Sequence, residues 1–213
     1  MKLLFSGCSI TYGDELQNKR QERFSRLVSD HFSARHINIS ECGISNDNIV
    51  RRTIDWVDRI PPDLIIMQFT VHQRIEWWGE DSKPHGFTPQ RIKSEIQRKY
   101  YKDVYTNHLG VENLWKNMFL FDCYCKDKGI KYIPLVADHF DGIIKHPEKF
   151  FKKGIGQWRE LCKNIPYTFL NQNCLGTSEQ CPENYAQGVK GGHPTAIGHQ
   201  VIANKVIELI DAI

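Results

Sequence analysis

Residues 2–13 have the sequence Lys-Leu-Leu-Phe-Ser-Gly-Cys-Ser-Ile-Thr-Tyr-Gly, and this stretch indicates the fold class. Its apolar run, Leu3-Leu4-Phe5, has the length of a strand, and Gly7 marks the place where the chain leaves that strand. The segment that follows, 22–32, has apolar residues at helical spacing. A strand that turns at a glycine and leads into a helix is the beginning of a β-α-β pattern.

The same alternation continues along the rest of the chain. Further strands are predicted at 35–39, 63–69, 131–137 and 167–170. Further helices are predicted after Ser45 up to Pro61-Pro62, and at 89–101, 111–128 and 195–213, the last with an apolar face of Ile197, Val201, Ile202, Val206 and Ile210. This order predicts a three-layer α/β/α sandwich around a five-stranded, mainly parallel, flavodoxin-like sheet. Its site is expected at the carboxyl ends of the strands.

The length of 213 residues favours a single domain, 1–213. Two stretches, at about 71–110 and 138–166, are too long to be simple connections. We interpret both as insertions, and we expect the first to lie over one end of the sheet.

Composition excludes several classes of protein. Charged residues make up 25% of the chain and hydrophobic residues 40%, which is ordinary for a globular protein and unlike a disordered, collagen-like or coiled-coil chain. The longest apolar runs, such as 64–67, are far too short to cross a membrane. The net charge of only +3 does not favour nucleic acid as a partner. We assign the basic residues Arg51-Arg52 and the stretch 91–102 to solvated helix faces.

The expected location is the cytoplasm. Phe5-Ser6-Gly7-Cys8 resembles a lipoprotein cleavage site, but the apolar stretch there is only Leu3-Leu4-Phe5, where a signal peptide needs about seven or more apolar residues. The seven cysteines contain no Cys-x-x-Cys pair, so neither a structural metal nor a cofactor is expected. Scattered free thiols fit a reducing compartment.

The residues that follow the predicted strands are the candidates for a site. They are Ser9, Gly43, Thr70, His72, Arg74, Asp138 and His139, with His193 in a glycine-rich loop before the last helix. From the residues alone, Ser9 is either a helix cap or a nucleophile, and Gly43 is either a turn glycine or an amide that a ligand approaches. His199 lies on a helix face and is assigned a structural role.

Together these residues resemble the SGNH (GDSL-type) hydrolases over nearly the whole chain. The block Gly7-Cys8-Ser9-Ile10-Thr11-Tyr12-Gly13 matches the family's first motif, with Cys8 in place of Asp. Gly43 matches the second motif, and Gly192-His193-Pro194 with Gly198-His199 matches the last. The resemblance implies Ser9 as nucleophile, His193 as general base, and the amides of Ser9 and Gly43 in the oxyanion hole.

Two positions depart from the family pattern. His72 stands near the place of the oxyanion-hole Asn of the third motif, and Asn46 is a second candidate for that role. Lys190 stands three residues before His193, where the family has the triad carboxylate. The sequence leaves three alternatives: a Ser-His dyad, a substitute carboxylate such as Asp138 or Asp14, or loss of activity.

The activity implied is that of a serine esterase or deacylase. Ser9 would attack an acyl carbonyl and form an acyl-serine intermediate, which water then hydrolyses. Arg74, Trp77 and Trp78 follow the third strand and suit a small-molecule or carbohydrate ester, such as an O-acetyl sugar, although the Trp pair can equally pack the insertion onto the sheet. The alternative function is a non-catalytic module of the same fold that binds a small ligand or sugar.

Overall fold

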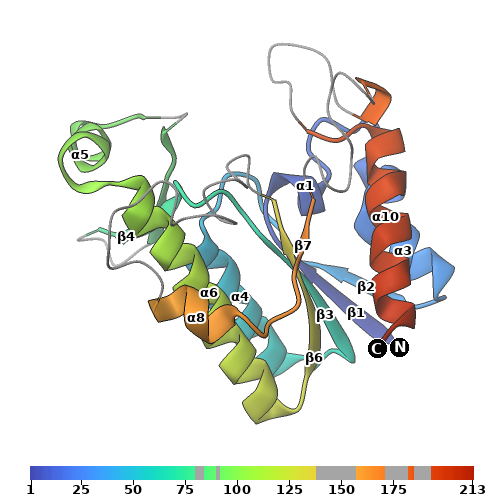
Figure 1. Ribbon diagram of the computed structural model, residues 1–213. Coiled ribbons are helices and arrows are strands. Elements are labelled where there is room, and N and C mark those ends of the chain that lie inside the picture. Colours follow the sequence, from blue (N-terminus) through green and yellow to red (C-terminus); the bar gives the residue numbers. More distant parts are fainter. Residues whose placement is uncertain (80–83, 90–91, 138–156, 171–181, 185–192) are drawn as a thin grey trace.

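The centre of the molecule is a five-stranded parallel sheet (Figure 1). The computed structural model describes residues 1–79, 84–89, 92–137, 157–170, 182–184 and 193–213. The strands lie in the order β2-β1-β3-β6-β7, and every neighbouring pair is parallel. Their bounds are β1 (Lys2–Ser6), β2 (Arg35–Asn38), β3 (Leu64–Phe69), β6 (Lys131–Val136) and β7 (Thr168–Phe169). This is the flavodoxin-like order, so the predicted fold class is confirmed.

Strand β3 lies between β1 and β6 and has all six residues buried. Its sequence, Leu-Ile-Ile-Met-Gln-Phe, has no apolar-polar alternation because both faces of a parallel sheet are covered by helices. One consequence is that a polar residue in this strand must find its partner inside the protein.

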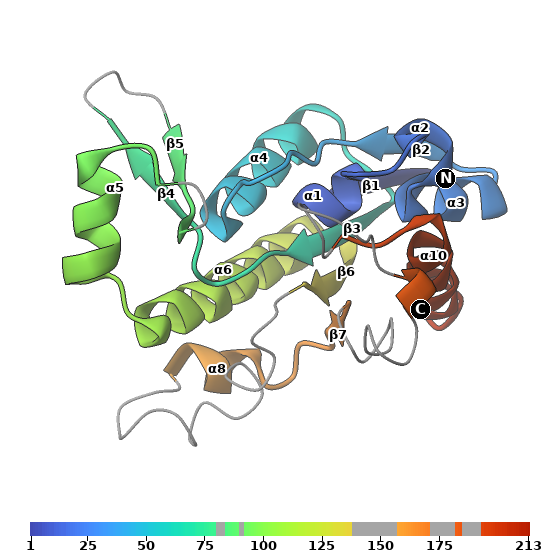
Figure 2. The ribbon, with the colours of Figure 1, turned by 90° about the horizontal axis from the view of Figure 1, so that it is seen from above.

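Helices cover the sheet on both faces, as Figures 1 and 2 show. On one face, Leu3 and Phe5 of β1 pack against α3 (Phe24–His31) and α10 (Ala196–Asp211). On the other face, Leu4 belongs to the core formed with α4 (Asn46–Arg59), α6 (Asn107–Lys128) and α8 (Gln157–Cys162). Successive residues of a strand point to opposite faces, so one strand contributes to both cores. None of the helices in the described ranges is long and apolar enough to cross a bilayer.

The helix ends follow local sequence signals. Ser45 caps α4, its Oγ accepting from the amide of Asn48 at 3.3 Å, and α4 ends at Arg59 just before the two prolines. Thr195 caps α10 in the same way, with Gly198 as the donor at 3.2 Å. These boundaries agree with the predicted ones because caps and prolines act over a few residues.

The buried face of α10 differs from the prediction. Ile197 is 54% exposed, whereas Ile202 and Val206 are fully buried as expected. His199 is also fully buried, and its Nδ1 accepts a hydrogen bond from the amide of Phe24 at 3.1 Å. The predicted apolar face was wrong at Ile197, whereas the burial and hydrogen bond of His199 agree with the structural role assigned to it from the sequence.

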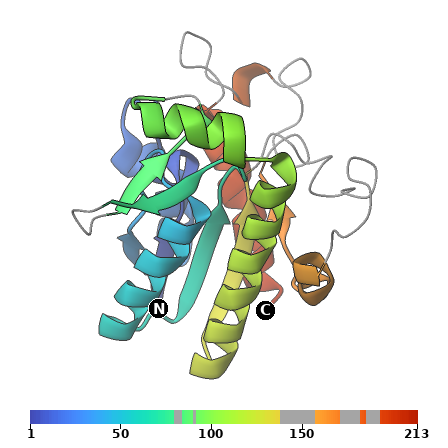
Figure 3. The ribbon, with the colours of Figure 1, turned by 90° about the vertical axis from the view of Figure 1, so that its left-hand side faces the viewer.

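Residues 71–110 contain a β-hairpin that was not predicted. Strands β4 (Ile75–Trp78) and β5 (Pro84–Phe87) pair in antiparallel fashion, apart from the main sheet. The helix predicted at 89–101 is shorter: α5 (Glu95–Lys99) begins after the capping residue Ser94 and continues into the π-helical turn Tyr100–Val104. Figure 3 shows the hairpin and α5 above the upper ends of α4 and α6.

Candidate active site

Ser9 is the first residue of the short helix α1 (Ser9–Tyr12), directly beyond the carboxyl end of β1. Gly13 ends this helix in the left-handed region, with φ of 83°. The amides of Gly13 and Asp14 both donate to the carbonyl oxygen of Ser9 at 2.9 Å. Ser9 is 8% exposed, so its hydroxyl lies at the edge of the sheet on a tightly bonded turn.

Gln68 of β3 supports this turn through hydrogen bonds that its side-chain oxygen accepts. Its Oε1 accepts from Thr11 Oγ1 at 2.6 Å, from the Thr11 amide at 3.1 Å and from the Cys8 amide at 3.3 Å. A Cβ on Gly7 would lie 2.6 Å from Thr11 Oγ1 and 2.8 Å from Gln68 Cβ, so the glycine lets the strand end approach Gln68. Sequence reasoning missed Gln68, although a Gln in an otherwise apolar strand was a usable signal.

Cys8, which stands in place of the family's Asp, is paired with Arg74. The guanidinium Nη1 of Arg74 contacts Cys8 Sγ and donates to Thr70 Oγ1 at 3.0 Å. Burial raises the pKa of the Cys8 thiol, but Arg74, Thr70 and Ser9 lower it, and the net pKa is below the ordinary value. Arg74, predicted to bind substrate, therefore has its guanidinium directed at the residue before Ser9.

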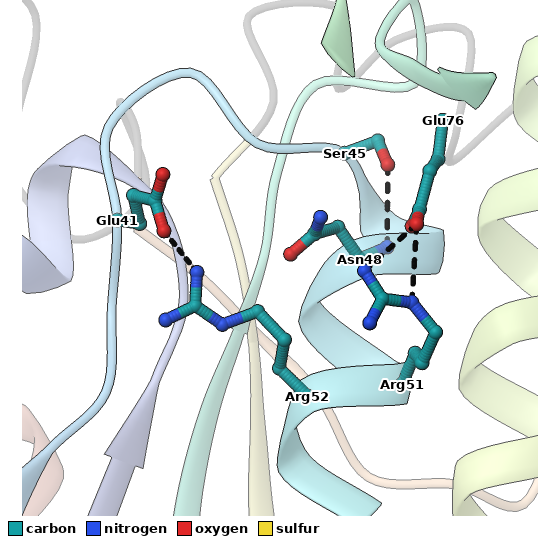
Figure 4. Close-up of polar contacts among 6 residues, drawn as sticks. All are labelled: Glu41, Ser45, Asn48, Arg51, Arg52 and Glu76. Carbon is teal, nitrogen blue, oxygen red and sulfur yellow. Dashed lines mark hydrogen bonds and ion pairs between the residues drawn. The ribbon is translucent and has the colours of Figure 1, made fainter. Parts of the chain in front are cut away.

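Gly43 lies in the loop between β2 and α4, beside the Ser9 turn. Its φ is 82°, and a Cβ at this position would meet nothing within 4 Å, so one side of the residue is open. The amide of Glu41 donates to the Gly7 carbonyl at 3.2 Å, which ties the loop to the end of β1. Figure 4 shows the side chain of Glu41 paired with Arg52 of α4.

The two candidates for the third oxyanion donor lie next to the end of β3: Asn46 is the first residue of α4, and His72 follows β3 in the chain. Asn46 is 1% exposed; its Oδ1 accepts from the Thr70 amide at 2.7 Å and its Nδ2 donates to the Thr70 carbonyl at 3.1 Å. His72 is also 1% exposed and packs on α6, where a Cβ on Gly110 would lie 2.6 Å from the His72 carbonyl oxygen. Asn46 thus braces the end of β3 and retains one amide proton for another acceptor.

His193 lies beside Glu15, a contact that the sequence did not predict. The Nδ1 of His193 is 3.4 Å from Glu15 Oε1, and the two side chains are 24% and 16% exposed. Asp14, one of the two predicted substitute carboxylates, interacts with Cys42 instead: burial and then Asp14 raise the pKa of that thiol to about 12. Asp138, the other substitute, and Lys190 lie outside the described residues. Glu15 belongs to no motif. Its place two residues after the Gly7–Gly13 block was the one feature of the sequence that could have indicated a role at the site.

The hairpin β4–β5 forms one side of this region. A Cβ on Gly86 of β5 would lie 3.7 Å from the Gly43 carbonyl oxygen. Glu76 of β4 accepts from Nε and Nη2 of Arg51 in α4 at 3.0 and 2.8 Å, as Figure 4 shows. Hydrogen bonds between charged groups at this distance anchor the hairpin to α4.

The predicted tryptophans lie on the same hairpin. Trp77 is 44% exposed and stacks on Phe87, with ring centroids 6.3 Å apart. Trp78 is 53% exposed, and the Arg51 guanidinium lies 5.4 Å from its ring centroid. Each ring therefore packs on one face and leaves about half of its surface in solvent. Within the described ranges, no three His, Cys, Asp or Glu side chains gather in a group suited to a metal ion.

No protein-family model and no curated protein sequence matches this chain. Solved structures do resemble it in fold along almost its whole length. The lipolytic protein of the G-D-S-L family from Desulfitobacterium hafniense has a TM-score of 0.60 at 12% identity, covering 97% of this chain and 98% of that chain. The psychrotrophic esterase EstA from Pseudoalteromonas sp. has a TM-score of 0.61 at 11% identity, covering 99% and 97%.

A third similar structure is a catalytic mutant of Axe2, an acetylxylan esterase from Geobacillus stearothermophilus. It has a TM-score of 0.57 at 12% identity and covers 97% of this chain and 92% of that chain. These identities are low, so the comparison concerns the arrangement of strands and helices. The chain has the fold of the SGNH, or GDSL-type, hydrolases.

Proposed function

We propose that the protein is an SGNH-type serine esterase that hydrolyses a small ester through an acyl-serine intermediate. The observation that carries this proposal is the position of Ser9. It opens α1 directly after β1, on a turn held by Gln68, with the open side of Gly43 in the adjoining loop. The similarity in fold to esterases supports the same class of reaction.

In the proposed reaction, Ser9 attacks the acyl carbonyl while His193 takes the hydroxyl proton. The amides of Ser9 and Gly43 stabilise the oxyanion, with His72 or Asn46 as the side-chain donor. A donor of this kind is typically worth about 3 kcal/mol in the transition state. His193 then protonates the leaving alcohol, and water releases the acyl group from Ser9.

We further propose that the substrate is a polar ester, such as an O-acetyl group on a carbohydrate. Trp77 and Trp78 expose about half of their surfaces on the hairpin next to the Gly43 loop, and exposed aromatic rings provide flat contacts for sugar rings. Two of the structures with similar fold are described as acetylxylan esterases. Activity on acetylated sugars and on p-nitrophenyl esters of graded chain length tests this assignment.

We place the activity in the cytoplasm. Five cysteines in the described residues are free thiols: Cys8, Cys42, Cys123, Cys125 and Cys162. Thiols that stay unpaired fit a reducing compartment.

The first prediction tests Ser9 as nucleophile. A fluorophosphonate should label the protein at one site, because an activated serine reacts with it, and Ser9→Ala should abolish labelling and hydrolysis while leaving the fold unchanged. Mass spectrometry of the labelled peptide checks the position. Ser40→Ala is the matched control, because Ser40 is also a buried serine after a strand and lies outside the proposed machinery. Absence of labelling in the wild type would favour the non-catalytic binding module.

A further inference from the structure

We propose that Glu15 is the positioning residue for His193, in place of the carboxylate that SGNH sequences carry three residues before the histidine. The proposal rests on the esterase function and assigns a role to a residue outside the family motifs. It replaces the predicted substitutes, Asp138 and Asp14, by a carboxylate on the same turn as the nucleophile.

The side chains of Glu15 and His193 are in contact. Glu15 Oε1 lies 3.4 Å from His193 Nδ1, which is within ion-pair distance and longer than a closed N–H···O bond of about 2.9 Å. Hydrogen bonds of catalytic residues are often long in a ligand-free enzyme and shorten in the substrate complex. Within the described part of the chain, this Nδ1 atom is buried and makes no hydrogen bond, so its position beside Glu15 leaves the carboxylate as its acceptor.

The backbone of Glu15 has an unusual conformation. Its φ is 68°, in the left-handed region that costs a residue other than glycine about 1 kcal/mol or more. Such conformations persist where the surroundings impose them, and they concentrate at active sites. The turn that carries Glu15 is joined to Ser9 by the amides of Gly13 and Asp14, both 2.9 Å from the Ser9 carbonyl oxygen. The position of the carboxylate is therefore coupled to that of the nucleophile.

His193 is held from the other side by the start of α10. The Thr195 amide donates to the Asn184 carbonyl at 3.0 Å, and the Thr195 hydroxyl caps the helix through Gly198 at 3.2 Å. His199, on the first turns of α10, is in turn bonded to Phe24 of α3 at 3.1 Å. The contact of Glu15 with His193 thus joins the first and last segments of the chain, each anchored independently.

The chemistry follows from the two ring nitrogens. A carboxylate that accepts from Nδ1 keeps the proton on that atom and leaves Nε2 free to take the Ser9 proton. It also stabilises the imidazolium that forms when the proton arrives. Asp14 is less suited to this role because it interacts with the Cys42 thiol.

The test combines kinetics with a measurement that needs no activity. In Glu15→Gln, the amide N–H₂ can donate to Nδ1 and favour the wrong tautomer, so kcat should fall at least about a hundredfold while KM changes little. Glu15→Asp, which retains a carboxylate, should recover at least about tenfold of that loss. Nitrogen-15 NMR of the full chain, with the His193 signals assigned from His193→Asn, should show the Nδ1–H tautomer in the wild type and less of it in Glu15→Gln.

Two comparison variants make the outcome decisive. Asp30→Asn on α3 removes a carboxylate from an exposed ion pair with Arg26 and should change neither readout. A loss from Asp14→Asn equal to or larger than that from Glu15→Gln, or an unchanged His193 tautomer in Glu15→Gln, would overturn the proposal. If Glu15→Gln does not fold, the proposal is tested by the His193 tautomer in Glu15→Asp. Loss of the Nδ1–H tautomer in that variant, which retains a carboxylate, would contradict the proposal. The two proposals can fail independently. If the protein is not an esterase, fluorophosphonate does not label it, while the His193 tautomer still depends on Glu15.

Discussion

At the scale of the residue, Gln68 determines the shape of the turn that carries Ser9. It is 1% exposed, and its Oε1 is the acceptor for two groups of Thr11 and for the amide of Cys8. Its neighbours in β3 are apolar, so none of them can replace this acceptor. The cost of removing it is large because buried donors left without a partner are destabilising.

We therefore predict that Gln68→Met lowers the free energy of unfolding by about 2–4 kcal/mol, the penalty for two or three unsatisfied buried donors. It should also lower kcat, since the Ser9 turn loses its support. Urea unfolding and ester hydrolysis check the two effects. Gln200→Met on the exposed side of α10 is the control and should stay within about 0.5 kcal/mol of the wild type. A Gln68→Met protein with normal stability would show that the turn holds its own shape.

At the scale of the element, the start of α10 is fitted closely against the η4 turn (Pro182–Asn184). A Cβ added to Gly198 would lie 2.3 Å from the Asn184 carbonyl oxygen and 3.0 Å from Pro194 Cβ. The nearest of these atoms is backbone, which cannot move aside as a flexible side chain can. The glycine therefore lets the helix and the turn approach each other, and the amide of Thr195, two residues after His193, donates to the same Asn184 carbonyl at 3.0 Å.

Gly198→Ala should separate α10 from the η4 turn and displace His193. The expected result is a loss of about 1–3 kcal/mol of stability, as for other overpacked sites, with a larger relative loss of kcat/KM. Thermal unfolding and hydrolysis assays measure both. Because alanine favours a helix more than glycine does, a stabilised Gly198→Ala protein would contradict the close packing. Gln200→Ala, an exposed position on the same helix, controls for the effect of alanine itself.

At the scale of the whole molecule, the buried His199 and the partly buried His36 make stability depend on pH. Burial, followed by the charge of His193, lowers the pKa of His199 to about 4. Burial, followed by Arg23 and Arg26, lowers the pKa of His36 to about 4. Both rings are therefore neutral in the folded protein at a pH where the unfolded chain binds protons, and acid favours unfolding.

The sign and the range follow from these values. The stabilisation that comes from keeping these rings neutral is complete above the unfolded pKa of about 6.5. It is lost as the pH falls toward the folded pKa of about 4. Between about pH 7 and pH 5, His199 alone should cost about 2 kcal/mol of unfolding free energy. His199→Asn, whose Oδ1 can still accept from the Phe24 amide, should lose less stability than the wild type over this range. Urea unfolding at both pH values is the measurement, and equal losses in the two proteins would contradict the assignment.

Much of the fold was predictable from the sequence because its signals are local. The apolar residues of the strands predicted at 2–6 and 63–69 act over a few residues, and so do the caps Ser45 and Thr195 and the two prolines after α4. The same locality placed Ser9 and Gly43 at strand ends. Where several weak local signals competed, as in the β4–β5 hairpin and at Ile197 of α10, the prediction was wrong because packing decided the outcome.

The tertiary structure alone decided which side chains meet around Ser9. Gln68 reaches the turn across the β1–β3 pair, Arg74 reaches Cys8 from beyond the end of β3, and Glu15 meets His193 near the other end of the chain. These residues are distant in sequence and carry no shared motif. Their contacts form because parallel strands bring their carboxyl ends to one edge of the sheet, where the loop conformations, and not the sequence spacing, set which groups lie within a few ångströms of each other.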